Sequence, residues 1–562
     1  MLAILLGFLQ AWASRMSVSD DAVCYLDVGD YIWHGQWLRA VNGIWSPLYG
    51  AILGLVVEVF HPSLDWEYPL VHLILYLFFI FALGCFDFLL RELILLRRET
   101  ESHEEAAIAD WVWLTIGYSV FLWSSLDLIG VTETNPDMLV AASFYLACAL
   151  LVRLRRGVAG WPAYLGLGLT LGLGYLTKSI MFPVSVLCLG IAFLWGWKRG
   201  QIRQASGALL VFLVAATPFI TALSLERGKL TFGETGRYNY AIHVNQLQPM
   251  HWQGGPAENG WPIHPTRQIV DRPATFEFAG PIGGTYPAWY DASYWYEGVQ
   301  GHFNLPLAVK TVARLLRIEG LILFELQGSL IASLFVLFYV GARKWSVAKD
   351  LSTYSFLLLP ALATLLLYAL IYIEPRYLAP FLAVLLVGLF FSVHLPASAE
   401  SRRLYSAVAI FIFAMFLYSS ASTSLHLRGL ARDVLGRSTV DPNSYQQVAK
   451  EMYRQGLRPG DRIASLQWSS FNAAQVARLD RVQIIAEVYY WPTHPDTIAN
   501  DFWKADPAAQ ERVIQAIGRT GARVIISQMA PSPSGAAGWT RVGNTDYYSY
   551  WLASSAQGSV TK

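Results

Sequence analysis

Two adjacent carboxylates, Asp20 and Asp21, directly follow the first apolar segment of the chain, in the stretch SDDAVCYLD. Ionisable side chains beside apolar segments are costly, so each is a functional candidate. A carboxylate next to an apolar wall gains basicity by desolvation and can deprotonate a hydroxyl or amine. We assign Asp21 as the candidate base and Asp20 as its neighbour and possible substitute. The alternative is that one or both cap the helix that follows, because Ser and Asp are preferred N-cap residues.

Two cations stand apart from the other basic residues: Lys178 in LGLGYLTKS and Arg376 in IEPRYLAP. Arginine offers a planar fork for two phosphate oxygens and lysine a point charge. The alternative is that both snorkel to the membrane interface. A base together with cations suits a reaction that deprotonates a nucleophile and releases an anionic leaving group.

Glu133, Asp137 and His243 could assemble a divalent-metal site from three separate segments. No short ligand spacing supports such a site. Hydrogen bonding within the outer loops is the interpretation we favour, so we predict no cofactor and leave a divalent metal as an option. The four cysteines are scattered, with no CxxC, which argues against a disulfide framework or a zinc site.

The composition is that of a membrane protein. Of the 562 residues, 54% are hydrophobic and only 14% are charged, whereas soluble domains carry about 25% charged residues. The formal net charge of +1 lacks the basic excess expected of a nucleic-acid partner.

About 11 apolar runs are candidates to cross the membrane. They cover residues 1–14, 68–96, 111–127, 137–152, 161–177, 180–197, 206–224, 319–341, 353–373, 377–394 and 404–420. Residues 1–14 are short for a span and could also pass for a signal peptide, but we favour a first transmembrane helix, either full or truncated.

Basic clusters between these runs predict the orientation through the positive-inside rule. Placing all of them in the cytoplasm leaves SDDAVCYLD and the C-terminal part outside; the clusters are Arg97 with Arg98, 153–156, 197–199, 342–344 and 401–403. If the short apolar stretch 46–60 crossed the membrane, every later basic cluster would move to the opposite side. We therefore expect it to be an interfacial or re-entrant helix on the outer face.

The segment 225–318 is rich in Trp, Tyr, Gly and Pro. It is too long and too aromatic for a passive connector. Its rings could stack on sugars or line a lipid headgroup site, and an interfacial aromatic belt is the alternative for any single residue.

After residue 420 the pattern changes to alternating helices and strands, with helices expected at 444–461 and 506–521 and strands at 462–466, 482–490 and 522–528. This alternation predicts a small extracytoplasmic α/β domain with a mainly parallel sheet. The expected division is a transmembrane domain, 1–420, with outer-face loops 15–67 and 225–318, and a soluble domain, 421–562. The soluble domain has no GxGxxG and no P-loop, so we expect a structural or acceptor-docking role.

The order of these motifs resembles the GT-C class of membrane glycosyltransferases, within it the bacterial relatives of protein O-mannosyltransferases and of the lipid A aminoarabinose transferase. The resemblance covers residues 1 to about 420 and rests on Asp21 with Tyr25 in DxxxY spacing, SPLYG at 46–50, Asp137 in TNPDML, Lys178 in LGLGYLTKS, and Arg376 with Tyr377 in PRYLAP. The chain departs from the aminoarabinose-transferase relatives at Trp45 and Ser46, where they have an acidic residue and a Lys.

The resemblance implies a polytopic α-helical enzyme of the cytoplasmic membrane that moves a hexose or pentose, with inversion, from a polyprenyl-phosphate donor. The acceptor would be a lipid, glycan or protein on the outer face. Lys178, Arg376 and Tyr377 would bind the donor phosphate, and Tyr25, Asp137, Glu133 and His243 would contact substrate. A transporter or lipid flippase and a non-catalytic envelope scaffold are the alternatives; the clustering of charges at one face argues against transport.

Overall fold

The chain divides into two compact units. The computed structural model describes residues 1–158, 160–247, 251, 254, 260–264, 266–278, 280–294, 298–341, 347–419, 431–432, 435, 444–466, 470–488, 501–528, 531 and 537–552. Unit 1 comprises Met1–Ala13, His72–Asn245 and Phe303–Gly436, and unit 2 comprises Ser14–Val71, Gln246–His302 and Arg437–Lys562. Residues 420 and 421, the predicted domain boundary, lie outside the described residues, so that boundary stays a prediction.

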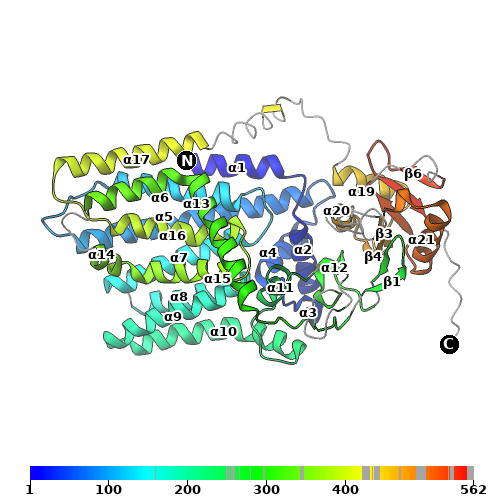
Figure 1. Ribbon diagram of the computed structural model, residues 1–562, viewed down its shortest axis with the longest axis horizontal. Helices are drawn as coiled ribbons and strands as arrows, with labels where there is room; N and C mark the ends of the chain where they lie inside the picture. The colour runs from blue at the N-terminus through cyan, green and yellow to red at the C-terminus, as the bar shows by residue number, and fades with distance from the viewer. Residues whose placement is uncertain are drawn as a thin grey trace. The chain divides into compact units, whose positions relative to one another are not determined.

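Unit 1 is built of α-helices that run alongside one another (Figure 1). A helix covers each apolar run predicted to cross the membrane, and seven of the described helices are long and apolar enough to cross one. The helices are α1 (Leu2–Ser14), α5 (Glu67–Thr100, which begins in unit 2), α6 (Asp110–Leu122) with the π-helix η1 (Trp123–Ile129), α7 (Asp137–Arg156), α8 (Trp161–Thr177), α9 (Met181–Lys198), α10 (Ile202–Arg227), α11 (Thr235–His243), α13 (Leu305–Gly341), α14 (Val347–Thr353), α15 (Ser355–Ala369), α16 (Pro375–Ser392) and α17 (Ala399–Ser419).

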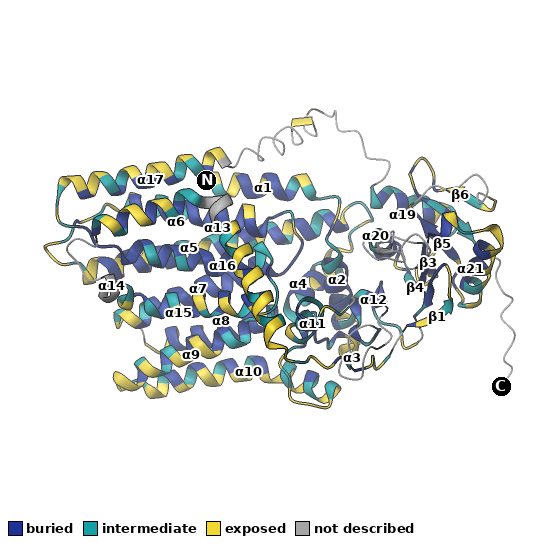
Figure 2. Cartoon of the chain, in the orientation of Figure 1, coloured by how far each residue is buried: buried dark blue, intermediate teal, exposed yellow. Residues whose placement is uncertain are grey.

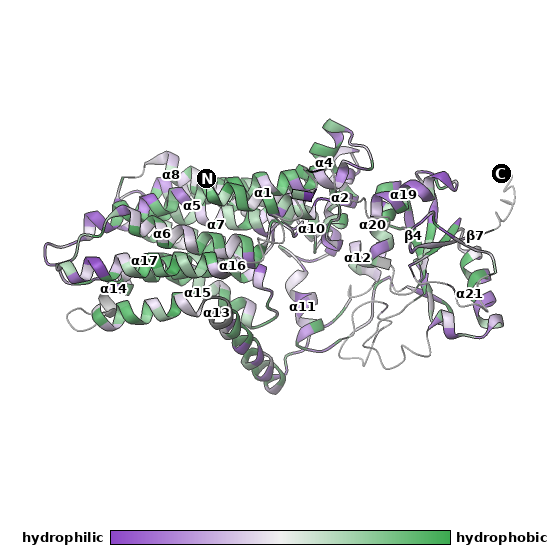
Figure 3. Cartoon of the chain, turned by 90° about the horizontal axis from the view of Figure 1, so that it is seen from above, coloured by the Kyte–Doolittle hydropathy of each residue, from purple (hydrophilic) through white to green (hydrophobic). Residues whose placement is uncertain are grey.

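The outward faces of these helices are apolar and exposed. Figure 2 shows the exposure along α9, α10 and α17, and Figure 3 shows that the helices of this unit are largely hydrophobic. Leu210 and Val214 of α10 are 63% and 68% exposed, while most of α7 is buried. A belt of exposed apolar side chains is unfavourable in water and suits contact with lipid. The prediction of a polytopic membrane protein is confirmed.

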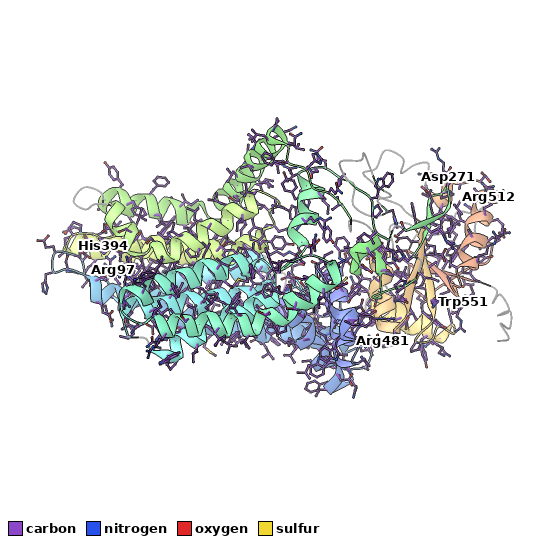
Figure 4. The ribbon with its side chains drawn as sticks, turned by 90° about the horizontal axis from the view of Figure 1, so that it is seen from below. Arg97, Asp271, His394, Arg481, Arg512 and Trp551 are labelled. Atoms are coloured by element: carbon purple, nitrogen blue, oxygen red, sulfur yellow. The ribbon has the colours of Figure 1, made fainter. Side chains whose placement is uncertain are left out.

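Most of the basic clusters used to predict the orientation meet at one end of these helices. Arg156 pairs with Glu99 at 2.7 Å, and Arg199 donates to the carbonyl of Arg155 at 2.7 Å. Arg97 donates to the Phe391 carbonyl at 2.8 Å, and Figure 4 labels it beside His394. Residues 342–344 lie outside the described residues. The clusters that these contacts involve, at 97–98, 153–156 and 197–199, lie at one end of the helices, and their side of the membrane stays a prediction.

In unit 2 the short helices α2 (Asp20–Trp33), α3 (Trp37–Ala40) and α4 (Pro47–Phe60) follow the first helix of the chain. Helix α4 coincides with the short helix predicted over 46–60. Helices α2 and α4 meet backbone to backbone: a Cβ on Gly54 would lie 2.6 Å from the Cα of Gly29, and one on Gly50 would lie 2.7 Å from the Tyr25 carbonyl oxygen. Only glycine permits this approach.

Gly54→Ala is therefore expected to destabilise unit 2 by about 3 kcal/mol, the upper end of the usual range for overpacking, because the added methyl group meets backbone and no flexible side chain. The matched control is Gly84→Ala in helix α5, where an added Cβ meets nothing within 4 Å and alanine is favoured by about 1 kcal/mol. Thermal unfolding of the detergent-solubilised variants measures both. Equal midpoints would contradict the close approach.

The C-terminal part of unit 2 contains a seven-stranded sheet in the order β1-β2-β4-β3-β5-β7-β6. Three predicted strands are confirmed as β3 (Arg462–Leu466), β4 (Gln483–Val488) and β5 (Val524–Ser527), and they pair in parallel. The remaining strands are β1 (Arg267–Val270), β2 (Thr275–Glu277), β6 (Trp539–Arg541) and β7 (Tyr548–Trp551), all of which pair antiparallel.

The prediction of a mainly parallel sheet is therefore wrong. Strands β1 and β2 come from the aromatic segment 225–318 and extend the sheet beyond β4 through antiparallel pairing. Such short strands lack the alternating pattern that reveals a strand in sequence.

Helices pack beside this sheet. The predicted helices α19 (Tyr445–Arg454) and α21 (Pro507–Arg519) are confirmed, whereas α20 (Ser470–Asp480) has no predicted counterpart. The aromatic segment adds the short α12 (Pro287–Tyr290) and η3 (Ala292–Tyr294), and η6 (Phe502–Lys504) precedes α21.

Candidate functional site

Three predicted site residues of unit 1 form one charged cluster. Asp137 is the first residue of α7, Lys178 follows the last residue of α8, and Arg376 lies in the first turn of α16. The Lys178 Nζ atom lies 2.5 Å from Asp137 Oδ1, and Arg376 Nη1 lies 3.9 Å from Asp137 Oδ2. The Asn135 Oδ1 atom accepts the backbone N–H of Asp137 at 2.9 Å. The positive end of the α7 dipole also favours a carboxylate at this position.

Tyr377 supports both cations. The Lys178 Nζ atom lies 3.7 Å from the centre of the Tyr377 ring, and Arg376 Cζ lies 5.1 Å from it. Both contacts are within the range of cation–π attraction. The Tyr368 ring packs against Tyr377 with centroids 5.5 Å apart.

The exposure of the cluster is uneven. The Asp137 side chain is 3% exposed, while Lys178 is 18% and Arg376 is 20% exposed. One buried carboxylate thus contacts two cations whose side chains are partly exposed. An arginine and a lysine arranged in this way can bind a phosphate group.

This cluster lies at the end of α7 opposite the basic clusters. Asp137 starts that helix and Arg156 ends it, and a helix of this length spans about 30 Å, close to the thickness of the hydrocarbon core. Asp137, with Lys178 and Arg376 beside it, thus lies near one end of α7, and Arg156 lies at the other.

His243 extends the aromatic side of the cluster. Its ring stacks on Tyr372 with centroids 3.9 Å apart and planes 9° from parallel, and Tyr372 lies edge-on to Tyr377 at 6.3 Å. Burial, reinforced by the positive charge of Arg314, lowers the pKa of His243 to about 4. His243 is therefore neutral at physiological pH and adds no charge to the cluster.

This depressed pKa predicts acid sensitivity. Unfolded His243 binds a proton below about pH 6.5, whereas the folded residue stays neutral down to about pH 4. Between these values the unfolded chain binds more protons, so the free energy of unfolding falls as the pH is lowered. With allowance for solvent screening of the half-buried ring, we expect a loss of about 1 kcal/mol from this residue at pH 5.

Thermal midpoints measured between pH 7.5 and pH 5 test this expectation. His243→Phe keeps the stacked ring and should reduce the acid-induced fall, while His103→Phe, at an exposed position, should not. An equal fall in wild type and His243→Phe would contradict the assignment.

Glu133 is exposed, and its backbone carbonyl accepts the N–H of Asn135 at 2.9 Å. Among the described residues, no three His, Cys, Asp or Glu side chains are grouped to hold a metal ion. The combination of Glu133, Asp137 and His243 is thus not brought together as a ligand set in that part of the chain.

In unit 2, Asp20 and Asp21 occupy the first turn of α2. The Ser19 hydroxyl oxygen accepts the backbone N–H of Ala22 at 3.3 Å, so Ser19 supplies the N-cap at this position. The Asp21 Oδ1 atom accepts a hydrogen bond from the indole Nε1–H of Trp289 at 3.2 Å. Both aspartates are partly exposed, so Asp21 combines access with an aromatic neighbour.

Tyr25 lies one helical turn after Asp21 and is 4% exposed. Its ring packs edge-on against Trp45 at 5.3 Å and Tyr49 at 4.9 Å. These contacts make Tyr25 part of the packing between α2 and α4, and its predicted contact with substrate stays a prediction. Trp289, which contacts Asp21, is a site residue that the sequence prediction missed. The signal that could have found it is its place in YPAWYD, within the aromatic segment 225–318.

Solved structures share this fold. ArnT from Cupriavidus metallidurans bound to undecaprenyl phosphate matches with a TM-score of 0.50 at 11% identity, covering 99% of this chain and 98% of that chain. The apo state of the same protein gives a TM-score of 0.49 at 13% identity, covering 99% and 97%. Archaeal oligosaccharyltransferase AglB from Archaeoglobus fulgidus, in complex with an inhibitory peptide and a dolichol-phosphate, gives 0.45 at 11% identity, covering 94% and 68%.

Neither a family model nor a curated protein sequence matches the chain. The likeness to ArnT, which extends over nearly the full length of both chains, confirms the predicted GT-C-like fold. It also shows that the likeness continues beyond residue 420, where the sequence resemblance ends.

Proposed function

We propose that this protein is a membrane glycosyltransferase that moves a sugar from a polyprenyl-phosphate donor to an acceptor. The observation that carries the proposal is the buried Asp137, which holds the partly exposed Lys178 and Arg376. Two cations fixed before the donor arrives can stabilise the charge that develops on a departing phosphate without reorganisation. The bound undecaprenyl phosphate of the ArnT structure supports a lipid phosphate as the group that this cluster binds.

Asp21 is the proposed general base. The acceptor hydroxyl or amine gives its proton to the Asp21 carboxylate, and its oxygen or nitrogen forms a bond to the anomeric carbon of the sugar. The bond between that carbon and the phosphate oxygen breaks, and the polyprenyl phosphate leaves with the electron pair. Attack from the side opposite the phosphate inverts the anomeric centre, and the sugar is a hexose or a pentose.

The other predicted residues take supporting roles. Asp137 orients the two cations, and Tyr377 supports them as part of the donor phosphate site. His243, Glu133 and Tyr25 are proposed to contact substrate, and Asp20 is the proposed substitute for Asp21. We propose no cofactor and leave a divalent metal as an option, and adding EDTA to the transfer assay tests it.

The proposed place of action is the outer face of the cytoplasmic membrane. Lipid-linked donors supply sugar where nucleotide sugars are absent, which suits a site facing outward. The acceptor is a lipid, glycan or protein on that side, and the C-terminal part of unit 2 is proposed to be extracytoplasmic.

The test is sugar transfer from a panel of radiolabelled polyprenyl-phosphate sugars into membranes with and without the protein. We expect transfer from at least one donor, which identifies the sugar, and binding of undecaprenyl phosphate by the purified protein. Movement of a lipid-linked sugar across liposomes without transfer would favour a flippase. Neither transfer nor phosphate binding would overturn the proposal in favour of a scaffold.

A further inference from the structure

Helix α20 presents one face to the segment that carries Asp21. Phe471, Gln475 and Arg478 are spaced four and three residues apart, so they lie on the same side of the helix; we call them the α20 face. The Gln475 Oε1 atom accepts the backbone N–H of Val18 at 3.3 Å, immediately before the N-cap of α2. The Gln475 carbonyl accepts the hydroxyl of Tyr68 at 2.7 Å.

Arg478 contacts three carboxylates, two on α2 and one at the start of α5. Its Nη1 atom lies 3.3 Å from Asp27 Oδ1, its Nη2 atom 3.1 Å from Asp30 Oδ1, and its Nε atom 3.1 Å from Glu67 Oε1. The Arg478 side chain is 2% exposed. A buried guanidinium that contacts three carboxylates fixes their relative positions, because its donors diverge in one rigid plane.

The electrostatic contact extends to Arg481, which Figure 4 labels in this unit. Its Nη2 atom lies 2.7 Å from Glu67 Oε2. Asp27 also accepts the backbone N–H of Thr285 at 2.6 Å, four residues before Trp289. The network therefore holds α2 and the Trp289 segment through the same carboxylate.

Phe471 reaches Asp21 through one intermediate ring. It lies edge-on to Trp289 with centroids 5.3 Å apart and planes at 87°, and it contacts Tyr286 similarly at 5.5 Å. The Trp289 Nε1–H donates to Asp21 Oδ1 at 3.2 Å. Removal of the Phe471 ring would therefore take away one of the rings packed against the indole that hydrogen-bonds to the Asp21 carboxylate.

We infer that the α20 face positions Asp21, the base of the proposed reaction. The C-terminal part of the chain therefore contributes to the acceptor site. This inference rests on the proposed function and extends it. Val18, just before α2, and Asp27 with Asp30, on α2, are held by the α20 face on either side of Asp21 in the chain. Phe471 packs against Trp289, which hydrogen-bonds to Asp21. Phe471 and Arg478 are thus positioning residues, which act through Trp289 and the backbone of α2.

A positioning role predicts a loss of turnover without a loss of donor binding. Displacement of a catalytic group by about 1 Å can cost about a hundredfold in rate. We expect Phe471→Ala to lower kcat for transfer by about tenfold to a hundredfold, with an unchanged KM for the donor and unchanged affinity for undecaprenyl phosphate. Phe471→Tyr, which keeps the ring, should recover most of the activity.

The matched control is Arg523→Ala, which removes an exposed ion pair with Asp461 at 2.6 Å in the same unit and should leave kcat unchanged. Hydrogen–deuterium exchange of peptides covering residues 19–33 supplies a readout that needs no activity. We expect faster exchange there in Phe471→Ala, and none of this acceleration in the control.

Two results would overturn the inference: full turnover in a folded Phe471→Ala variant, or equal losses in Phe471→Ala and Phe471→Tyr. Absence of transfer by wild type would instead contradict the proposed function. Hydrogen–deuterium exchange over residues 19–33 would still test the inference in that case. Unchanged exchange in Phe471→Ala would show that the α20 face does not hold α2.

Discussion

Asp21→Asn is expected to abolish sugar transfer, with kcat reduced by about a thousandfold, within the range that general base catalysis contributes. Asparagine keeps the shape of the side chain and can still accept the Trp289 N–H, which donates to Asp21 Oδ1 at 3.2 Å. It cannot take a proton from the acceptor. The variant should therefore fold, bind undecaprenyl phosphate as wild type does, and fail only in the chemical step.

Asp20→Asn is the matched control, because it removes one negative charge from the same helical turn. As the neighbour and proposed substitute of Asp21, Asp20 should matter less, and we expect a fall of about tenfold or smaller. Transfer assays on Asp20→Asn and Asp21→Asn, at matched expression levels, show which of the two aspartates is the base. Equal activity of wild type and Asp21→Asn would remove Asp21 from the mechanism, and the reverse order of losses would assign the base to Asp20.

Lys178→Met is expected to weaken binding of undecaprenyl phosphate by about a hundredfold, because charge-assisted contacts to phosphate are each worth about 1.5–3 kcal/mol. The same change leaves the buried Asp137 with Arg376 Nη1, at 3.9 Å, as its ion-pair partner among the described residues. Breaking a buried pair costs about 3–5 kcal/mol, so Lys178→Met alone should also destabilise the protein.

The double variant Lys178→Met with Asp137→Asn separates these two effects. It also removes the charge of Asp137, which has lost its lysine partner, so the thermal midpoint should return toward that of wild type, while binding of the lipid phosphate should stay weak. Lys504→Met, which removes an exposed lysine paired with Asp501 at 3.1 Å, controls for the loss of a positive charge. Wild-type affinity in the stable double variant would show that Lys178 serves packing and does not bind the donor.

The sequence predicted the helices of unit 1 well because their signal is local. Runs of apolar residues long enough to span lipid and clusters of arginine between them need no knowledge of distant contacts. The same argument explains why Lys178 and Arg376 could each be identified from the sequence. A charged side chain beside an apolar helix is energetically unfavourable, so it marks a candidate site even when its partners are unknown.

The elements that were missed depend on distant partners. Strands β1 and β2 are short, and they become strands by pairing with each other and with β4, more than 200 residues later in the chain. Three of the six apolar residues of α20 are alanines, which bury little surface and leave a weak pattern. Its face is defined by contacts of Phe471, Gln475 and Arg478 with segments hundreds of residues earlier.

Local chemistry therefore determined that this chain is a polytopic helical membrane protein with carboxylate and cation candidates beside its helices. Tertiary structure decided which of these charges meet. It placed Asp137 against Lys178, 41 residues away, and gave the N-cap of α2 to Ser19. The physical reason is that burial and helical periodicity act over one or two turns, whereas ion pairs and ring contacts form between side chains that only the packed backbone brings together.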